Sequence, residues 1–246
     1  MRVLTALPIH NEAAYVKSVL SELLTHTREV LAVDDGSNDA TPNLLRGFPQ
    51  VKVIRHPVNL GYGASLRSAF AFALQHGYDA LATIDCDGQH QPSLIAQLVT
   101  ALTTTSADIV SGSRYLSHHP GDARPPEDRR RINLNITQTL NQLFGWRLTD
   151  AFCGFKVYRR EALERFDITE NGYAMPLQLW VQAYRWNLRI HEEPVPLIYL
   201  EEARAFGGAL DNPAIRLNHY LDVLRGELER QGLHHLLGRS EASLTP

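Results

Sequence analysis

The first half of the chain alternates short apolar runs with stretches in which apolar residues recur at helical spacing. Runs rich in Val, Ile, Leu and Ala predict strands at 3–7, 30–33, 51–54, 78–84 and 108–111. The stretches between them predict helices at 12–25, at 41–46, after residue 65 up to about residue 75, and at 92–103. Strands that alternate with helices indicate an α/β fold with a mainly parallel sheet and helices on both faces.

The sequence YDALATIDCDGQHQ, residues 78–91, carries two carboxylates out of the end of a predicted strand. Asp85 and Asp87 are two residues apart, so on an extended backbone they point to the same side, with Gln89 and His90 just behind. Divalent cations such as Mg²⁺ prefer oxygen ligands of this kind. The pattern predicts a site that clamps a metal and a diphosphate. A solvated turn is the alternative, because Asp is common in loops.

Other polar motifs also follow predicted strands. The carboxylates of Asp34 and Asp35 could accept hydrogen bonds from a nucleotide, or could cap the helix that follows. Gly61 and Gly63 precede a helix whose N-terminus favours negative charge, but no further glycine completes a dinucleotide fingerprint. Arg114 follows the fifth strand. Because parallel strands end at one edge of a sheet, we expect these motifs to share one crevice.

The second half of the chain has a different pattern. Residues 116–128 have the prolines and glycine of a mobile loop, and Arg129–Arg131 precede an amphipathic helix at 132–145. This basic segment suits either an anionic lipid headgroup or a core helix with solvated arginines. Further elements are predicted at 156–158, 176–186, 189–192 and 213–230. We expect one domain at 1–212, including the loop and basic segment 116–131, and a C-terminal helix and tail at 213–246.

Composition limits the function classes. The formal net charge of the 246 residues is -3, which does not suggest a nucleic-acid-binding protein. Cys86 and Cys153 are far apart and lack the spacing of a zinc site or a disulfide framework, so we expect a reducing compartment. No apolar run reaches the roughly 18 residues that span a bilayer, and the N-terminal apolar segment is too short for a signal peptide. We expect a cytoplasmic protein, soluble or peripheral to the membrane.

Six motifs together resemble a known family. They are PIHNE, VDDGSNDAT, NLGYGAS, DCDGQHQP, GSRY and DAFCGFKVYRR, in this order between about residues 3 and 208. The chain resembles the inverting family 2 glycosyltransferases of GT-A fold. Within them it is most similar to the branch of dolichyl- and polyprenyl-phosphate mannose and glucose synthases. A literal Q-x-x-R-W, residues 182–186, also matches a motif of processive polysaccharide synthases, but it lies beside a strand typical of the lipid-phosphate branch, and we expect it to have no function here.

The resemblance implies a role for each matching position. Nucleotide-sugar contacts fall on Pro8, His10, Asn11, Glu12, Asp35, Asn59, Gly61 and Asp85. The ligands of Mg²⁺ or Mn²⁺ would be Asp85, Asp87 and Gln89. Catalytic roles fall on Asp87, Asp150, Arg114, Arg131 and Arg204. His10 stands where the family usually has an aromatic residue, which leaves the base of the donor open.

The resemblance implies metal-dependent, inverting transfer of a hexose from a UDP- or GDP-sugar to a polyprenyl phosphate. Such an acceptor is already ionised and needs arginines, here Arg114 and Arg131, while Asp150 would position groups. One alternative is transfer to a hydroxyl of a soluble glycan or small acceptor, with Asp150 as the general base. Another is a non-catalytic sugar-nucleotide binding protein. Peripheral contact with the inner face of the membrane, a membrane-anchoring partner and a homo-oligomer are all compatible with the leading hypothesis.

Overall fold

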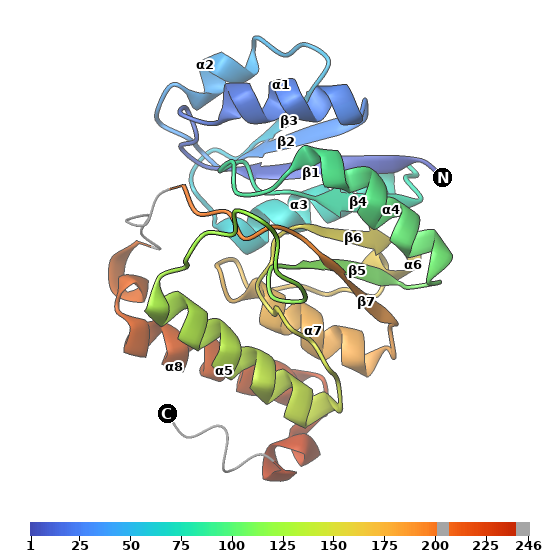
Figure 1. Ribbon diagram of the computed structural model, residues 1–246, viewed down its shortest axis with the longest axis vertical. Helices are drawn as coiled ribbons and strands as arrows, with labels where there is room; N and C mark the ends of the chain where they lie inside the picture. Colours follow the sequence, from blue (N-terminus) through green and yellow to red (C-terminus); the bar gives the residue numbers. More distant parts are fainter. Residues whose placement is uncertain (201–206, 240–246) are drawn as a thin grey trace.

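The computed structural model describes residues 1–200 and 207–239. Its centre is one seven-stranded sheet with the strand order β3-β2-β1-β4-β6-β5-β7 (Figure 1). The strands are β1 (Val3–Ile9), β2 (Val30–Asp34), β3 (Lys52–Arg55), β4 (Ala80–Thr83), β5 (Ile109–Ser113), β6 (Lys156–Arg159) and β7 (Ile190–Pro194). The predicted α/β fold with a mainly parallel sheet is confirmed.

One strand runs against the others. β6 pairs antiparallel with both β4 and β5, whereas every other pairing in the sheet is parallel. The beginning of β6 therefore lies at the edge where the parallel strands end. Sequence periodicity does not report strand direction, so this arrangement was not predicted. Its effect is to bring the residues before β6 next to those that follow β4 and β5.

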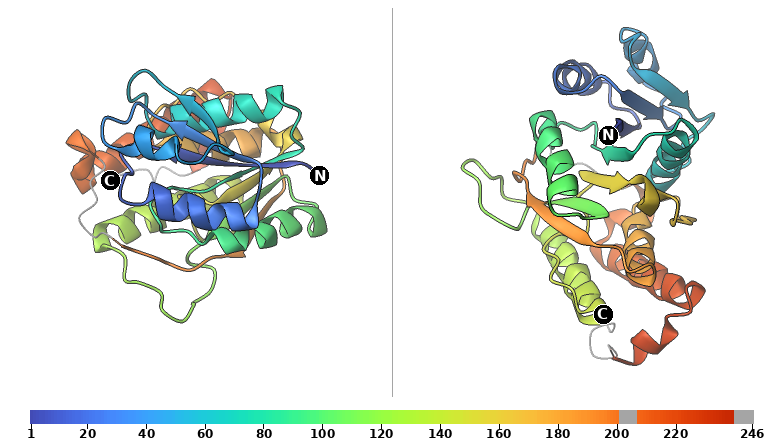
Figure 2. Two further views of the ribbon diagram at one scale, coloured as in Figure 1. Left: turned by 90° about the horizontal axis from the view of Figure 1, so that it is seen from above. Right: turned by 90° about the vertical axis from the view of Figure 1, so that its right-hand side faces the viewer.

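Helices cover both faces of the sheet, because inner strands such as β2, β4 and β5 are buried on both sides. In the view from above, α1 (Val16–His26) and α4 (Ile95–Thr104) lie on one side and α3 (Tyr62–Gln75) lies on the other (Figure 2, left). Successive β1 residues divide between two hydrophobic clusters: Leu4 and Ala6 pack on the α3 side, and Leu7 and Ile9 pack on the α1 side. The shorter helices are α2 (Thr41–Leu45) and α6 (Arg160–Leu163), with 3-10 turns at Pro92–Leu94, Gly208–Asp211 and His234–Arg239.

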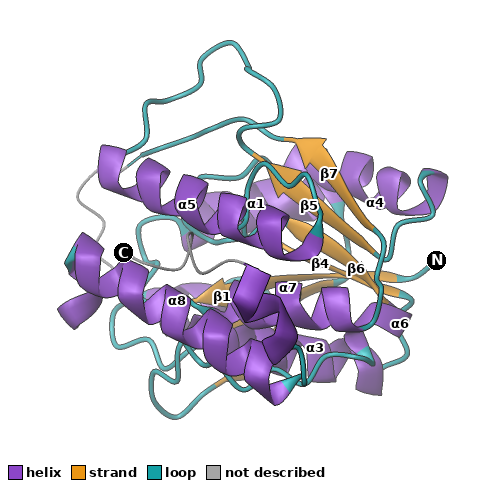
Figure 3. Cartoon of the chain, turned by 90° about the horizontal axis from the view of Figure 1, so that it is seen from below, coloured by secondary structure: helices purple, strands orange, loops and turns teal. Residues whose placement is uncertain are grey.

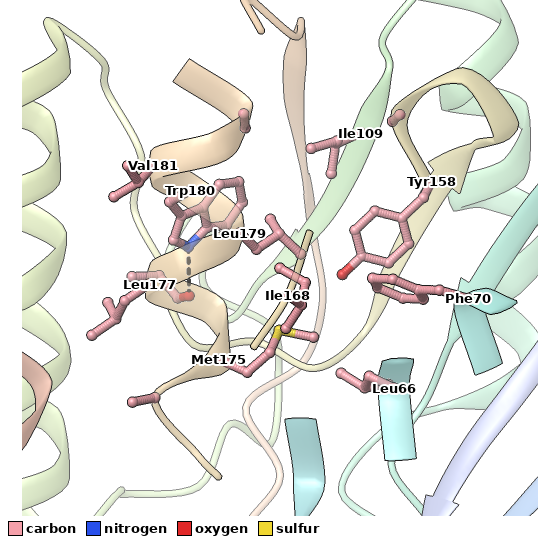
Figure 4. Close-up of a cluster of buried hydrophobic side chains, with 14 of the residues drawn as sticks. Leu66, Phe70, Ile109, Tyr158, Ile168, Met175, Leu177, Leu179, Trp180 and Val181 are labelled. Atoms are coloured by element: carbon pink, nitrogen blue, oxygen red, sulfur yellow. Dashed lines mark hydrogen bonds between the residues drawn. The ribbon is translucent and has the colours of Figure 1, made fainter. Parts of the chain in front are cut away.

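A further layer packs beyond the sheet on the α3 side. It consists of α5 (Glu127–Phe144), α7 (Met175–Arg185) and α8 (Pro213–Arg230), with α5 and α8 side by side (Figures 1 and 3). Trp180 lies at its centre, close to Met175 and Leu179, and donates its indole N–H to the carbonyl of Ala151 at 2.9 Å (Figure 4). Tyr158 and Phe70 continue the cluster towards the sheet. This packing holds α5, which carries the basic segment, at a fixed place beside the sheet edge.

The C-terminal helix is part of this core. Its residues Tyr220, Leu221, Leu224 and Leu228 are buried in the cluster shared with α3, α5 and α7. The fully buried carboxylate of Glu227 accepts hydrogen bonds from Gln178 and Gln182 of α7, each at 2.9 Å. The boundary expected at residue 212 therefore does not separate two cores. Gln182, the first residue of the Q-x-x-R-W sequence, has a packing role in this interface.

The predicted mobile loop is anchored at its middle. The carboxylate of Asp122 accepts a hydrogen bond from Leu197 N at 2.9 Å, and Ala123 N donates to the Leu197 carbonyl at 2.7 Å. The basic segment belongs to the first turns of α5, which begins at Glu127, five residues earlier than expected. Among the described residues, no helix is long and apolar enough to cross a membrane.

Candidate active site

A cavity of about 850 Å³ opens where the parallel strands end. It extends from the loops after β1, β2 and β4 to the N-terminal turns of α5 and α8. The residues predicted for the nucleotide sugar and the metal all line it: Pro8, His10, Asn11, Glu12, Asp35, Asn59, Gly61, Asp85, Asp87 and Gln89. Arg114 lines it as well, whereas Arg204 lies outside the described residues.

Asp85 is held rigidly at the floor of the cavity. Its Oδ1 accepts a hydrogen bond from the Tyr62 hydroxyl and its Oδ2 accepts one from His90 Nε2, each at 3.2 Å. Burial acts to raise the pKa of Asp85, but the hydrogen bond and charge of His90 outweigh it, so the pKa lies below its usual range. A Cβ at position 154 would stand 2.3 Å from Oδ2, so only Gly154 leaves room for this carboxylate.

The neighbouring residues offer oxygen atoms that suit a divalent cation. Asp87 accepts a hydrogen bond from Gln89 N at 3.0 Å across a turn in which Gly88 has a φ of 74°. Within residues 1–200 and 207–239, no group of three or more His, Cys, Asp or Glu side chains forms a complete metal cluster. Asp85, Asp87 and Gln89 present a partial, oxygen-rich set, which fits Mg²⁺ or Mn²⁺ when phosphate oxygens supply further ligands.

The carboxylate of Asp35 is used by the protein itself. Its Oδ1 accepts from Leu60 N at 2.9 Å and its Oδ2 accepts from Gly61 N at 2.7 Å. His56, which sequence reasoning missed, donates from Nδ1 to Asp35 Oδ1 at 2.6 Å. Asp35 therefore shapes the loop before α3, which lines one end of the cavity. The signal available in the sequence was a histidine directly after the third strand.

His10 is fixed through both ring nitrogens. Its Nδ1 lies 2.8 Å from the Asp35 carbonyl, which only accepts hydrogen bonds, so Nδ1 carries a proton. The side-chain amide of Asn11 donates to His10 Nε2 at 3.2 Å. The ring of His10 therefore lines the cavity in one orientation.

The N-terminus of α3 differs from expectation. Gly63 N and Ala64 N both donate to the carbonyl of Asn171, at 2.7 and 3.2 Å, so these amides are not open to an anion. The close approach allowed by glycine here serves chain packing: a Cβ at Gly63 would lie 2.2 Å from the Glu170 carbonyl. The glycine motif thus joins α3 to the segment before α7 instead of cradling a phosphate.

Arg114 and Asp150 form a bidentate ion pair beside the cavity. Arg114 Nε donates to Asp150 Oδ2 at 2.7 Å and Nη2 donates to Oδ1 at 2.9 Å, while Asn133 Nδ2 also donates to Oδ1 at 2.7 Å. Asp150 is fully buried. Burial acts to raise the pKa of Asp150, but Arg114 and Asn133 lower it to about 2. A carboxylate with so low a pKa and no open face is suited to positioning Arg114, and poorly suited to removing a proton from an acceptor.

The far end of the cavity is lined by Arg129, which belongs to the basic segment but was given no catalytic role, and by Arg216, which was not predicted. Arg216 is buried, and its Nη2 donates to Asp128 Oδ2 at 2.5 Å, which joins α8 to the start of α5. Aromatic and apolar side chains complete this end: Tyr115, Ile132, Phe152, Tyr199 and Tyr220. Arg131, the predicted phosphate ligand, is exposed and does not line the cavity.

Comparison with known proteins identifies the family. Residues 5–166, more than half of the chain, match the family described as Glycosyl transferase family 2. The chain belongs to this family. It is 31% identical to undecaprenyl-phosphate mannosyltransferase from Micrococcus luteus, over 97% of this chain and 100% of the relative. It is 30% identical to polyprenol monophosphomannose synthase from Mycolicibacterium smegmatis, over 79% of this chain and 76% of the relative.

Solved structures agree with the fold of this glycosyltransferase. Glucosyl-3-phosphoglycerate synthase from Mycobacterium tuberculosis, solved with Mn²⁺, UDP and glucosyl-3-phosphoglycerate, superimposes with a TM-score of 0.70. The alignment covers 92% of this chain and 79% of the other, at 18% identity. The GT-A fold expected from the sequence is confirmed, as is the assignment to the glycosyltransferases.

Both cysteines of this glycosyltransferase are buried. Cys86, between Asp85 and Asp87, packs in the cluster on the α1 side and also lines the cavity. Cys153 is fully buried, and burial raises its pKa to about 11, so it is not a thiolate at neutral pH.

Proposed function

We propose that this enzyme transfers a hexose, with inversion, from a UDP- or GDP-sugar to a polyprenyl phosphate, and that it uses Mg²⁺ or Mn²⁺. The observation that carries the proposal is the acceptor end of the cavity, which combines arginines with apolar and aromatic walls, and beside which the carboxylate of Asp150 is locked in an ion pair. This chemistry suits an anionic head on a hydrocarbon chain. The names of the relatives from Micrococcus luteus and Mycolicibacterium smegmatis point the same way.

The donor occupies the end of the cavity near β1, β2 and β4 in this proposal. Asp85, Asp87 and Gln89 hold the cation, whose charge stabilises the leaving diphosphate when it is bound. His10 and the loop shaped by Asp35 contact the nucleoside. Tyr62 and His90 keep the Asp85 carboxylate ionised and oriented. Arg204, for which a role at the leaving diphosphate remains a proposal, lies outside the described residues.

The acceptor occupies the end near α5 and α8. A phosphate oxygen of the acceptor forms a bond to the anomeric carbon as the bond from that carbon to the diphosphate breaks. Because a phosphate monoester, with its second pKa near about 6, is ionised at neutral pH, no proton has to be removed from it. Arg114, Arg129 and Arg216 neutralise and orient the phosphate, and Asp150 fixes Arg114.

Transfer to a hydroxyl is the second candidate. It requires a general base near the acceptor, and Asp150 was the expected one. The buried ion pair with Arg114 argues against that role.

A cytoplasmic location with peripheral contact at the inner face of the membrane suits the leading proposal, since the phosphate of the acceptor lies at a membrane surface. A membrane-anchoring partner and a homo-oligomer also remain proposals.

Paired acceptors test the function. The purified enzyme is incubated with UDP- or GDP-hexoses and Mn²⁺, together with a polyprenyl phosphate or the polyprenol of the same length that lacks phosphate. We expect a glycolipid only with the phosphate, and none after the metal is removed with EDTA. Asp87→Ala should abolish transfer. Transfer to polyprenol, or to a soluble glycan in preference to the phosphate, would support the hydroxyl mechanism; binding of donor without any transfer would support the non-catalytic alternative.

A further inference from the structure

Glu192 is a residue of β7 that has no part in the functions proposed above. It accepts hydrogen bonds from the backbone beside the Arg114–Asp150 ion pair. Its carboxylate is partly buried and faces the turn that precedes β6. Glu192 Oε1 accepts from Asp150 N at 3.1 Å and from Thr149 N at 3.0 Å. Its Oε2 accepts from Thr149 N at 2.8 Å and from the Thr149 hydroxyl at 3.0 Å. One carboxylate therefore fixes the backbone from which the Asp150 side chain projects.

In the hydrogen bonds that link Glu192 to Thr149, Ser113 and Tyr115, the donor and the acceptor can each be assigned. A carboxylate only accepts, so the Thr149 hydroxyl donates to Glu192. Thr149 Oγ1 must then accept at its 2.5 Å contact with Ser113 Oγ, and Ser113 donates. Ser113 Oγ in turn accepts from Tyr115 N at 3.2 Å. The negative charge of Glu192 thus orients a chain of donors that ends at Tyr115, a residue of the cavity wall.

These hydrogen bonds fix Arg114 in two ways, through its ion-pair partner and through its neighbours in sequence. Its ion-pair partner, Asp150, is held by Glu192 through the backbone, and its two neighbours in sequence, Ser113 and Tyr115, are held through Thr149. We propose that Glu192 is a positioning residue, which in its ionised form holds Arg114 and Asp150 in the geometry that receives the acceptor. The inference rests on the proposed function for what is received, but its structural part stands on these contacts alone.

The charges around Glu192 support a dependence on its ionisation. Asp150 faces it from the turn before β6, and the charge of Asp150 is paired with that of Arg114, which follows β5. On its own strand, His191 and Glu193 pair with each other at 2.9 Å. Burial raises the pKa of Glu192 above its ordinary value, against the lowering effect of its hydrogen bonds, and the negative charge of Asp150 adds to the rise.

Protonation of Glu192 would turn one acceptor oxygen into a donor that faces other donors. The wild-type kcat/KM for the acceptor should therefore fall on the acid side of its pH profile as this group gains a proton. The substitution Glu192→Gln removes the ionisation, so that variant should lose this acid step. A purely structural role for Glu192 would not change the shape of the pH profile.

The test uses Glu192→Gln, with Glu193→Gln as the matched control on the same strand. Glu193 bonds Gln97 and His191 and does not line the cavity. Glu192→Gln should lower kcat/KM for a polyprenyl phosphate at least about tenfold, since it leaves backbone donors poorly paired, and should change the KM of the donor less than twofold. Glu193→Gln should match the wild type. Two results would overturn the proposal: a wild-type kcat/KM for the acceptor in Glu192→Gln, or an equal fall of kcat/KM for donor and acceptor.

A second measurement is independent of the reaction. Hydrogen exchange at the amides of Thr149 and Asp150, followed by mass spectrometry of peptides that span them, should be faster in Glu192→Gln than in the wild type or in Glu193→Gln. If the wild type transfers nothing to polyprenyl phosphate, the proposed function fails, while unchanged exchange would overturn the positioning role. If Glu192→Gln does not fold, Thr149→Val replaces it, and a wild-type acceptor KM in that variant would contradict the proposal.

Discussion

At the scale of single residues, some carboxylates near the cavity are fully hydrogen-bonded to other protein groups. Asp150 and Asp35 have their oxygens occupied by the protein, by Arg114 and Asn133 in one case and by His56 and Gly61 N in the other. A fully used, buried carboxylate contributes rigidity, because leaving its donors unpaired is costly.

The ion pair of Asp150 should make stability depend on pH. Its pKa in the folded protein, about 2, lies below the ordinary 3.8, so its contribution is present above about pH 4 and is lost as pH falls towards 2. We expect Asp150→Asn to lower the free energy of unfolding by about 3 kcal/mol at pH 7. The difference from the wild type should be smaller in urea titrations at about pH 3 than at about pH 5. Asp222→Asn, at an exposed pair with Arg225, should be neutral.

The proposed binding of an acceptor phosphate distinguishes two arginines near the start of α5. Arg129 lines the cavity and lies 6.0 Å from the ring centre of Tyr199, whereas Arg131 is exposed. Arg129→Met should raise the KM for polyprenyl phosphate about tenfold, since a hydrogen bond to a charged group is lost. Arg131→Met should stay within twofold of the wild type. Steady-state kinetics of the two variants with one acceptor would show the reverse order if the sequence-based assignment to Arg131 is right.

Residues at strand ends were predictable, and residues placed by packing were not. Asp85, Asp87, Asp35 and the residues after β1 line one cavity because parallel strands end at one edge, a rule that sequence can apply. Arg129 and Arg131 differ only in which side of a helix they occupy. That depends on where α5 begins and how it packs, and the pattern placed its start five residues late.

At the scale of elements, the glycine motif before α3 shows how one pattern can serve two purposes. Gly61 and Gly63 suggested an anion site, but Asn171 of a distant segment occupies the helix amides. Sequence alone could place the tight turn and could not foresee which group would approach it. Likewise the apolar pattern of β6 predicted a strand, yet its antiparallel direction depends on the long connection from β5.

Substitution of Gly63 tests the packing role of this motif. The Cβ of Gly63→Ala would stand 2.2 Å from the Glu170 carbonyl and 2.9 Å from Met175 Cβ, so we expect a loss of about 1–3 kcal/mol in unfolding free energy. Gly226→Ala, in the exposed surface of α8 with no atom within 4 Å, should stabilise the protein by about 0.5–1 kcal/mol. Thermal unfolding of both variants makes the comparison; a neutral Gly63→Ala would contradict the role.

At the scale of the whole molecule, α8 contributes side chains both to the hydrophobic core and to the wall of the cavity. α8 buries an apolar stripe against α5 and α7, and it contributes Arg216 and Tyr220 to the acceptor end. Its amphipathic pattern predicts a helix over 213–230, as the structure has it, but the pattern does not show which elements cover the apolar face. One shared core implies one cooperative unfolding transition.

The buried carboxylate of Glu227 tests this unity. Glu227→Ala would leave Gln178, Gln182 and Arg230 without their shared acceptor, so we expect a loss of about 3–5 kcal/mol. Circular dichroism and tryptophan fluorescence should report one coincident transition, shifted to lower denaturant. Glu229→Ala, exposed on the same helix, is the control. Two separate transitions in the wild type would indicate that α8 unfolds independently of the sheet.

The antiparallel direction of β6 has a consequence for how such enzymes can diverge. The chain leaves the sheet after Ser113 and returns before Lys156 at the same edge, where Ser113 and Thr149 are in contact. The segment between these residues, which includes α5, therefore begins and ends at neighbouring points of the sheet. Changes within this segment would alter the proposed acceptor end and leave β1, β2 and β4 in place, as long as the apolar side of α5 still packs against α8.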